Sequence, residues 1–351
     1  MKVGVLTFHR CINYGSYWQA RCLVEGLRAQ GHDAELLDHD DRQVRSAEWR
    51  CAFQPSLPAR TPRADLPRYA AKARKFLDAF ERLPQSPRFA LDQPQEAGEY
   101  DAVVIGSDEV WNFRHPWYGS KPIFFGERLR TRRLASYAAS FGNHDAEHGI
   151  DPAWAEKLER FDAISVRDEN SRRLVRQGLN REPALVLDPC LQFPPNATGP
   201  VEERAPYLAL YGHNFPDWFA AHIRDWAQAS GRTILSIGYR NDWADEQRIE
   251  AGPEEFSALI ASADAVATNF FHGCVFALHH QRPFVSAPSA YRFNKVRDLA
   301  QALAAERHVV TEQTPAERYA DLLGAPLDPA IGERIAAMRV QSGAYLATAL
   351  G

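Results

Sequence analysis

The stretch Ala265-Val266-Ala267-Thr268-Asn269-Phe270-Phe271-His272-Gly273 joins an apolar run typical of a strand to a segment typical of a helix, Cys274 to His280. At such a turn the unpaired backbone N–H groups and the positive end of the helix dipole face an incoming anion, and a glycine allows close approach to the backbone. His272, at this junction, could move a proton onto or off a bound phosphate compound. The alternative is a histidine that caps its own helix in a packed loop.

The same alternation of strand and helix runs through the second half of the chain. Short β-rich runs that alternate with amphipathic stretches indicate parallel sheets covered by helices. Strands are predicted at 207–211, 233–237, 265–267 and 284–286, and helices at 218–230, 254–262, 274–280 and 295–304.

The first half shows the pattern again, interrupted once. Strands are predicted at 3–7, 34–38, 102–106, 134–139, 163–166 and 185–187, with a helix at 17–30 that Gly31 ends. Residues 45–95 hold many prolines and arginines around one helix candidate, 66–82, and are interpreted as an irregular insertion. Pro194 to Pro206, rich in proline and charge, is interpreted as a linker between two halves.

The length of 351 residues exceeds what one hydrophobic core usually organises. We therefore expect an α/β fold with two Rossmann-like domains facing a central cleft, with ligands at the carboxyl ends of the strands. The predicted limits are 1–195 for the first domain, with the insertion, and 205–325 for the second. Residues 326–351 are expected to form a C-terminal helix that packs back on the first domain.

Composition excludes several classes of protein. The net charge is −4 and basic residues are scattered, which argues against a nucleic-acid surface. The five cysteines are odd in number and form no CxxC pair, so neither a zinc site nor a disulfide framework is indicated. No apolar run is long enough to span a bilayer and no signal-peptide pattern is present. We expect a cytoplasmic protein, at most in peripheral contact with the inner face of the membrane.

Polar clusters follow several of the predicted strands of the first half. The first contains Asn13, Tyr14, Gly15 and Gln19, the second spans 106–112 and includes Asp108 and Trp111, and the third is Arg167-Asp168. Each has a structural alternative, namely turn chemistry, a helix N-cap and a surface ion pair, respectively. Their common position on one rim of the sheet favours a functional site.

Five motifs match, in order, the polysaccharide pyruvyl transferase family, which the chain resembles from residue 3 to about residue 300. They are Phe8 through Asp38 with Asn13-Tyr14-Gly15 and Gln19, Tyr100 through Asn112, Ser136 through Gly142, Ile164 through Asp168, and Phe271-His272-Gly273. The resemblance implies a two-domain fold similar to GT-B glycosyltransferases and phosphoenolpyruvate as donor. It implies as acceptor a sugar of a surface glycan, such as an exopolysaccharide, or of its precursor. The product would be a pyruvate ketal bridging two hydroxyls.

The resemblance also implies roles for single residues. His272 would be the acid that protonates C3 of the enol, and Asp108 would orient or deprotonate the acceptor. The donor would be bound by Arg167, Asn269, Gly273, Arg292 and Lys295, and the acceptor by Asn13, Tyr14, Gln19 and Trp111. Some members of the family carry an arginine two residues before the histidine, where this chain has Phe270. Arg292 and Lys295 are candidates for that missing anion contact, although solvated charges at a helix start are an equal alternative.

A helix N-terminus lowers the pKa of an imidazole, whereas a bound phosphate and carboxylate favour the imidazolium. Our hypothesis is therefore that His272 is neutral in the empty protein and protonated in the loaded one. No cofactor and no metal are expected, because transfer from an enol leaves no diphosphate to be neutralised, and Asp38-His39-Asp40-Asp41 is interpreted as a polar turn.

Two rival functions remain open. One is a GT-B nucleotide-sugar glycosyltransferase, for which Glu246 and Glu254 stand at a spacing some such enzymes use. The other is an inactive sugar-binding or scaffold protein. Partners are expected to be phosphoenolpyruvate and a saccharide, which can be lipid-linked, polymeric or a small metabolite, and no nucleic acid. The sequence leaves open the sugar, its hydroxyl pair, the stereochemistry of the ketal and the oligomeric state.

Overall fold

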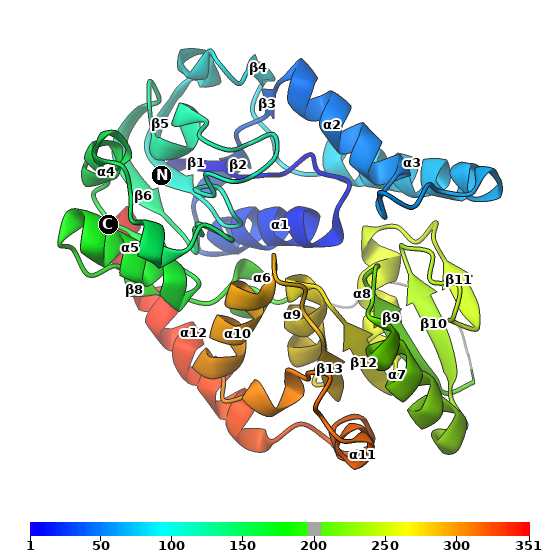
Figure 1. The fold of residues 1–351 in the computed structure, drawn as a ribbon. Coiled ribbons are helices and arrows are strands. Elements are labelled where there is room, and N and C mark those ends of the chain that lie inside the picture. The colour runs from blue at the N-terminus through cyan, green and yellow to red at the C-terminus, as the bar shows by residue number, and fades with distance from the viewer. Residues whose placement is uncertain (196–204) are drawn as a thin grey trace. The chain divides into compact units, whose positions relative to one another are not determined.

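The computed structural model describes residues 1–195 and 205–351, which divide into two compact units (Figure 1). Unit 1 consists of Met1–Glu48, Phe80–Pro195 and Ile335–Gly351, and unit 2 consists of Trp49–Ala79 and the described residues from 205 to Arg334. Three of the boundaries between the units fall inside helices, namely α2 (Arg42–Phe53), α3 (Leu66–Glu81) and α12 (Pro329–Leu350). Most of the predicted linker, residues 196–204, lies outside the described residues.

Unit 1 is built on a parallel sheet with the strand order β2-β1-β5-β6. These strands are β1 (Lys2–Leu6), β2 (Asp33–Leu36), β5 (Glu99–Ile105) and β6 (Arg130–Ser136). Parallel bridges from Ala135 to Ala163 and from Ala139 to Val166 continue the ladder to the pair β7 (Ser165–Val166) and β8 (Ala184–Leu185). A further parallel pair is β3 (His39–Asp40) and β4 (Phe89–Ala90). Since the strands run in one direction, their carboxyl ends share one edge.

Helices cover the sheet of unit 1, as its buried strands require. Val103, Val104 and Ile105 of β5 are at most 1% exposed, so consecutive residues on both faces are covered. The first helix begins where Asn13 Oδ1 accepts hydrogen bonds from the backbone N–H groups of Gly15 and Ser16, which caps its N-terminus. The helices of this unit are α1 (Tyr14–Ala29), α4 (Pro152–Glu159), α5 (Glu169–Leu179) and α6 (Pro189–Gln192), with 3₁₀ turns at Pro94–Ala97, Pro122–Phe125 and Ala146–His148.

Unit 2 contains a parallel sheet with the strand order β11-β10-β9-β12-β13. The order reverses between β9 and β12, and such a switch point is where open α/β sheets bind ligands. The strands are β9 (Tyr207–Tyr211), β10 (Thr233–Ile237), β11 (Glu246–Arg248), β12 (Ala265–Thr268) and β13 (Phe284–Ser286). The helices are α7 (Asp217–Ser230), α8 (Pro253–Ser262), α9 (Phe271–His279), α10 (Phe293–Ala302) and α11 (Ala316–Gly324), with 3₁₀ turns at Arg63–Asp65 and Glu306–His308.

The helical segment Trp49–Ala79 joins unit 2 through ion pairs with residues far along the chain. Arg68 Nε lies 2.7 Å from Glu250 Oε2, and Arg240 Nη1 lies 2.8 Å from Asp65 Oδ2. The predicted insertion at 45–95 is thus divided, with 49–79 in unit 2 and the rest in unit 1.

The last helix, α12, belongs to unit 1 from Ile335 onward. Ser342 Oγ accepts a hydrogen bond from Leu187 N at 3.0 Å, and the Tyr345 hydroxyl donates to Ser136 O at 2.7 Å. Residues 335–351 are therefore part of the packing at the carboxyl ends of β6 and β8.

The predicted α/β class with parallel sheets in two domains is confirmed, while the predicted cleft concerns the relative placement of the units and stays a prediction. Several boundaries differ. The helix predicted from Cys274 begins at Phe271, so His272 lies inside its first turn, and the strand predicted at 134–139 ends at Ser136. Neither α2 nor β11 was predicted, because each lies in a polar stretch without clear periodicity. Among the described helices, none combines the length and the apolar character that crossing a bilayer requires.

Candidate functional site

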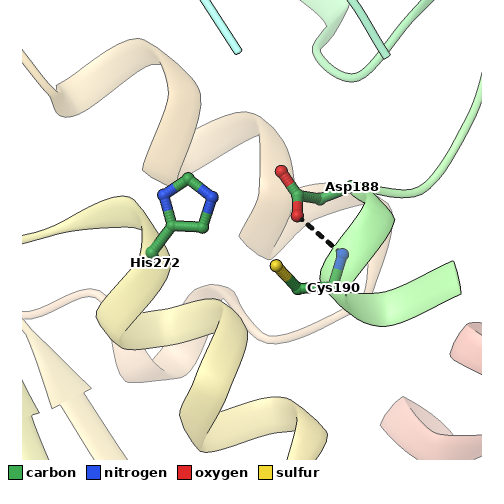
Figure 2. Close-up of side chains that lie close together, drawn as sticks. All are labelled: Asp188, Cys190 and His272. Atoms are coloured by element: carbon green, nitrogen blue, oxygen red, sulfur yellow. Dashed lines mark hydrogen bonds between the residues drawn. The ribbon is translucent and has the colours of Figure 1, made fainter. Parts of the chain in front are cut away.

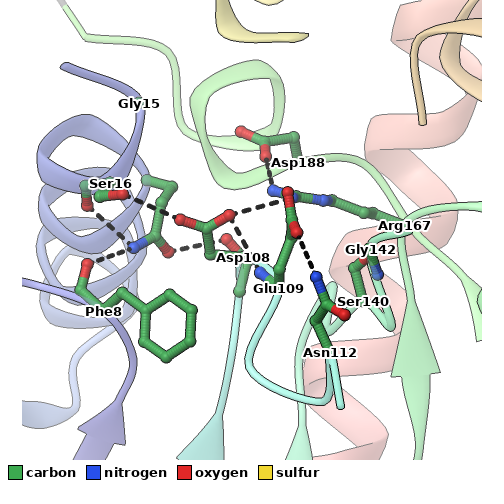
Figure 3. Close-up of polar contacts among 12 residues, drawn as sticks. Phe8, Gly15, Ser16, Asp108, Glu109, Asn112, Ser140, Gly142, Arg167 and Asp188 are labelled. Atoms are coloured by element: carbon green, nitrogen blue, oxygen red, sulfur yellow. Dashed lines mark hydrogen bonds and ion pairs between the residues drawn. The ribbon is translucent and has the colours of Figure 1, made fainter. Parts of the chain in front are cut away.

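The carboxyl edge of the unit 1 sheet carries a network of polar contacts centred on Asp108 (Figure 3). Ser16 Oγ donates to Asp108 Oδ2 at 3.0 Å, and Arg167 Nη2 donates to Asp108 Oδ1 at 3.1 Å. The other arm of the guanidinium, Nη1, donates to Asp188 Oδ2 at 2.9 Å. The segments that follow β5, β7 and β8 and the start of α1 are therefore tied together at one edge.

Arg167 is enclosed at the centre of this network, where its side chain is 1% exposed. Burial opposes the charged form, but the carboxylates of Asp108 and Asp188 outweigh burial and raise the pKa of Arg167 above its ordinary value. Arg167 thus holds Asp108 in place with a permanent positive charge. Its predicted contact with the donor anion stays a prediction.

The backbone places the Asp108 carboxylate by an uncommon conformation. Asp108 has a φ of +72°, in the left-handed region that aspartate tolerates better than most residues. Gly106, with a φ of +115°, passes so close to β6 that an added Cβ would lie 2.3 Å from Tyr137 O. The glycine of this motif is therefore required by the close approach of two loops.

Gln19 is fully buried and joins these loops from α1. Its Oε1 accepts a hydrogen bond from Ser107 Oγ at 2.7 Å, and its Nε2 donates to Phe8 O at 3.2 Å and to Ser16 O at 2.9 Å. With these contacts Gln19 fixes the two strand ends on which Asp108 depends. Its predicted contact with an acceptor stays a prediction.

The other residues predicted to bind the acceptor lie in different environments. Asn13 is half-buried and caps α1, whereas Tyr14 is fully buried within that helix. Trp111 is 1% exposed, packs against Phe125 and Phe141, and donates its indole N–H to Phe124 O at 2.8 Å, which is the environment of a core residue.

Glu48, at the end of the unit 1 part of α2, is a residue that the sequence did not indicate. Its Oε1 accepts hydrogen bonds from the Trp117 indole at 2.7 Å and the Cys11 thiol at 3.1 Å. Burial raises the pKa of Glu48 to about 7, the two hydrogen bonds oppose this rise, and the charge of Asp108 adds to it. A carboxyl group with a pKa near neutrality can accept or donate a proton at physiological pH.

In unit 2, His272 lies in the first turn of α9, directly after the switch-point strand β12 (Figure 2). Its side chain is largely buried. Gly273 has a packing role, because an added Cβ would lie 2.1 Å from Thr268 Oγ1. That hydroxyl donates to Tyr211 O at 2.6 Å and accepts from Phe270 N at 3.0 Å. The close packing of Gly273 on Thr268 therefore fixes the turn that carries His272.

The remaining residues predicted to bind the donor surround the same turn or follow β13. Asn269 Nδ2 donates to His213 O at 2.8 Å, which joins the loops after β12 and β9. The guanidinium carbon of Arg292 lies 4.2 Å from the ring centroid of Phe270, so the phenylalanine supports a cation on its face. Lys295 lies on the first turn of α10, and its Nζ is 5.6 Å from the ring centroid of Tyr291.

A cavity of about 400 Å³ opens beside this turn in unit 2. Asn269 lines it together with apolar side chains from α7 and α10, and Ser289 adds a hydroxyl. Such a mixture of apolar walls with a few polar groups is typical of sites for small molecules. The rest of its lining is Asn214, Pro216, Trp218, Ala287, Pro288, Phe293, Val310, Thr311 and Glu312.

Asp188 was also absent from the predicted site, although a signal for it existed. It follows directly after the predicted strand 185–187, as Asp108 follows β5, and its Oδ1 accepts a hydrogen bond from Cys190 N that caps α6 (Figure 2). Among the described residues, neither unit taken alone brings together three side chains able to hold a metal ion. The expectation of no metal stays a prediction.

Comparisons with known proteins give one family and a set of structures of similar fold. The chain resembles the UDP-GlcNAc 2-epimerase from Methanocaldococcus jannaschii in complex with UDP-GlcNAc and UDP, with a TM-score of 0.52 and 12% identity over 97% of this chain and 100% of that chain. The MnaA–UDP structure from S. aureus gives a TM-score of 0.53 at 8% identity, over 95% of this chain and 90% of that chain. At such identities the likeness shows the fold alone.

The glycosyltransferase SnogD from Streptomyces nogalater aligns with a TM-score of 0.47 at 15% identity, over 100% of this chain and 99% of that chain. A search of curated protein sequences gave no match. The polysaccharide pyruvyl transferase family model matches residues 13–288, which include Asn13, Asp108, Arg167 and His272. A match over most of the length, through both sheets, places the chain in the polysaccharide pyruvyl transferase family.

Proposed function

We propose that the protein transfers the enolpyruvyl group of phosphoenolpyruvate to two hydroxyls of a sugar in a surface glycan or its precursor. A proton adds to C3, which becomes the methyl group, and a sugar hydroxyl adds to C2 with loss of its proton. The C2–O bond to phosphate then breaks, and the second hydroxyl closes the ketal with loss of its own proton. Phosphate leaves carrying one proton, so atoms and charge balance.

One observation carries the donor half of this proposal. His272 stands in the first turn of the helix that follows the switch-point strand. The loop before it carries Asn269 and also Phe270, on whose ring Arg292 lies. A dense anion needs helix N-terminal amides and an arginine, and its enol needs a proton donor. His272 is the proposed proton donor to C3, neutral in the empty protein and protonated when the donor is bound.

For the acceptor half we propose the carboxylates of unit 1. Asp108, held by Arg167 and Ser16, would orient the sugar hydroxyls, and Glu48 would accept a hydroxyl proton. The pKa of Glu48 near 7 supports this role, because a base is most effective when its pKa is close to the working pH.

The first test is donor binding, measured by isothermal titration calorimetry with phosphoenolpyruvate and with uridine diphosphate as a parallel ligand. Arg292→Gln should weaken phosphoenolpyruvate about 10- to 100-fold, the cost of one charged hydrogen bond. Arg297→Gln is the matched control, since Arg297 lies in α10, the helix that Arg292 precedes, but contacts Asp298 at 2.8 Å. Equal binding of phosphoenolpyruvate by both variants would show that Arg292 does not contact the donor.

Turnover is the second test, measured as phosphate release from phosphoenolpyruvate in the presence of saccharide acceptors. Wild type should release phosphate only when an acceptor with two suitably placed hydroxyls is present, and mass spectrometry should find the ketal on it. Phosphoenolpyruvate binding without any acceptor-dependent release across glycan precursors would count against pyruvyl transfer.

A nucleotide-sugar glycosyltransferase is the second candidate, favoured by the cavity lined by Trp218 and Phe293, whose aromatic rings suit a nucleotide base. Glu246 begins β11 and Glu254 lies in the first turn of α8. Tight binding of uridine diphosphate without binding of phosphoenolpyruvate would establish this alternative and end the proposal of pyruvyl transfer.

A further inference from the structure

Three aromatic rings gather at the switch point of unit 2, each from the loop after a different strand. His213 follows β9, Tyr239 follows β10, and Phe270 follows β12. Their ring centroids are 5.1 Å apart for His213 and Tyr239, 5.3 Å for His213 and Phe270, and 5.4 Å for Tyr239 and Phe270. The rings therefore form one cluster at the edge where this class of sheet binds ligands.

Two cations stand on this ring cluster. Lys72, from α3, places its Nζ 4.4 Å from the Tyr239 ring centroid and donates a hydrogen bond to Gly238 O at 3.0 Å. Arg292 lies over Phe270, and its guanidinium donates a hydrogen bond to Ser289 Oγ at 3.2 Å. Among the described residues, no carboxylate forms an ion pair with Arg292. Lys72 is itself 3% exposed, which is unusual for a lysine.

Both cations act on the same imidazole. The pKa of His213 is lowered to about 4, first by burial and then by the positive charges of Arg292 and Lys72. Burial also lowers the pKa of Lys72 to about 7, while the Cys51 thiol opposes that shift. The loop after β9 thus experiences a positive potential from two directions, and His213 remains neutral at neutral pH.

The same edge holds buried polar atoms that the protein leaves unsatisfied. Asn269 is 2% exposed, and within the described chain its Oδ1 and the Nδ1 of His213 have no hydrogen-bond partner. Asn269 Oδ1 points at Gly212, where an added Cβ would lie 2.1 Å away and where φ is +144°. Unsatisfied buried polar groups cost stability and commonly mark a site that a ligand or water completes. Asn269 also lines the cavity of about 400 Å³.

We propose that Lys72 is a donor-binding residue and that, with Arg292, it forms a two-cation site for the phosphate of the donor above the His213, Tyr239 and Phe270 rings. The inference rests on the proposed function for the identity of the donor, and on the ring cluster for the place of the anion. The helix α3 then supplies one of the charges of the site from a segment that no motif marks.

The charge state of Lys72 gives the proposal a distinctive signature. A pKa near 7 leaves most of the ammonium deprotonated at about pH 8, and a bound dianion favours its protonation. Binding should therefore take up a proton. The groups near Lys72 include the Cys51 thiol, the Tyr239 phenol and the His213 imidazole, and of these only His213 could also gain a proton on binding an anion; Arg292 also acts on His213 but is already charged.

The experiment is calorimetry of phosphoenolpyruvate and of inorganic phosphate at about pH 8 in buffers of different ionisation enthalpy, which counts protons taken up. His272→Gln serves as the background, because His272 is proposed to gain a proton of its own. In that background we expect uptake approaching one proton per ligand, which should persist in His213→Gln and vanish in Lys72→Met. Lys72→Met should also bind about tenfold or more weakly.

Lys75→Met is the matched control, since Lys75 lies on the same helix but pairs with Glu255 at 2.6 Å, and it should behave as wild type. Lys72→Arg keeps the charge without titrating, so it should retain binding and lose the proton uptake. Absence of uptake in the His272→Gln background overturns the proposal even if the Lys72 variants fail to fold.

The outcomes separate this inference from the proposed function. Acceptor-dependent turnover with unchanged binding and proton uptake in Lys72→Met would rule out the proposed role of Lys72 but would not contradict pyruvyl transfer. Binding of inorganic phosphate that depends on Lys72, without any binding of phosphoenolpyruvate, would support the anion site and count against the donor.

Discussion

The two units share a parallel α/β plan and differ in the charge that each presents at the carboxyl edge of its sheet. In unit 1 the edge is built from carboxylates, Asp108 and Asp188, which one buried arginine holds in place. In unit 2 the edge is built from aromatic rings with Lys72 and Arg292 on their faces. Under the proposed function, the negative groups of unit 1 would serve hydroxyls that must lose protons, and the positive groups of unit 2 would serve an anion.

The means of fixing the edge differ as well. Unit 1 relies on ion pairs and hydrogen bonds around Asp108, whereas unit 2 relies on the close approach of glycines, Gly212 to Asn269 and Gly273 to Thr268. We therefore expect unit 1 to be sensitive to loss of charge and unit 2 to be sensitive to added volume.

The largest expected effect is on turnover, when His272 is replaced. His272→Gln should lower the turnover number for phosphate release about 10²- to 10⁴-fold, the usual contribution of a general acid. His279→Gln, on the last turn of the same helix, should retain activity. The measurement is steady-state phosphate release together with calorimetry of phosphoenolpyruvate. Wild-type turnover in His272→Gln would show that another residue protonates C3.

Removal of the buried cation of unit 1 comes next. Arg167→Met leaves Asp108 and Asp188 without their shared partner, and breaking such a buried pair costs about 3–5 kcal/mol of stability. Urea unfolding followed by fluorescence should show a markedly lower midpoint. The exposed Arg173 of α5 supplies the control, and Arg173→Met should unfold like wild type. A stable Arg167→Met protein would mean that the two carboxylates tolerate burial by other means.

Glu48 should make the stability of the protein depend on pH. Its pKa is raised from 4.5 to about 7, so the folded state keeps a proton that the unfolded state has lost. The stability contributed in this way is complete below about pH 4.5 and is lost as pH rises through about 7, by at most about 3 kcal/mol.

Glu48→Gln should remove that loss, so thermal unfolding at pH 5 and 8 should differ less in the variant than in wild type. Glu81→Gln is the control, because the side chain of Glu81 is 68% exposed. The same pH dependence in Glu48→Gln and wild type would assign the titration to another group and weaken the proposed role of Glu48 as a base.

The smallest expected effect tests the packing of unit 2. Gly273→Ala should cost about 1–3 kcal/mol, because its Cβ meets Thr268 Oγ1 at 2.1 Å and the turn carrying His272 must shift. Gly324→Ala has nothing within 4 Å of its Cβ and should be neutral or slightly stabilising in helix α11. Thermal melts of both variants measure the difference, and equal melting temperatures would show that the turn can relax.

Local signals in the sequence were enough to predict the sheets and the edge residues that follow strands. Asp108 and His272 could be found because they lie three and four residues after the ends of apolar strands, and a parallel sheet places such residues at its carboxyl edge. Asp188 obeys the same rule, because it directly follows the predicted strand 185–187, and it was overlooked although that strand was predicted.

Glu48 and Lys72 could not be found in this way. Each lies in a helix with no motif, Glu48 in α2 and Lys72 in α3, and their importance depends on contacts with distant residues, such as the one between Lys72 and Gly238 across 166 positions. Their shifted pKa values arise from burial, which helical periodicity alone does not reveal in a charged stretch. The predicted roles of the remaining site residues await the measurements above.

The assignment of 49–79 and 335–351 to units whose other parts lie far away in the chain has a consequence for biosynthesis. On the ribosome, the helix that carries Lys72 emerges long before the loops that bury its ammonium, and unit 1 lacks Ser342 and Tyr345 until all of unit 2 has been made. Unit 1 therefore cannot finish folding until all of unit 2 has been synthesised. Unit 1 should therefore depend on residues 335–351 for its native state, and a nascent chain stalled before residue 335 should remain a substrate for chaperones.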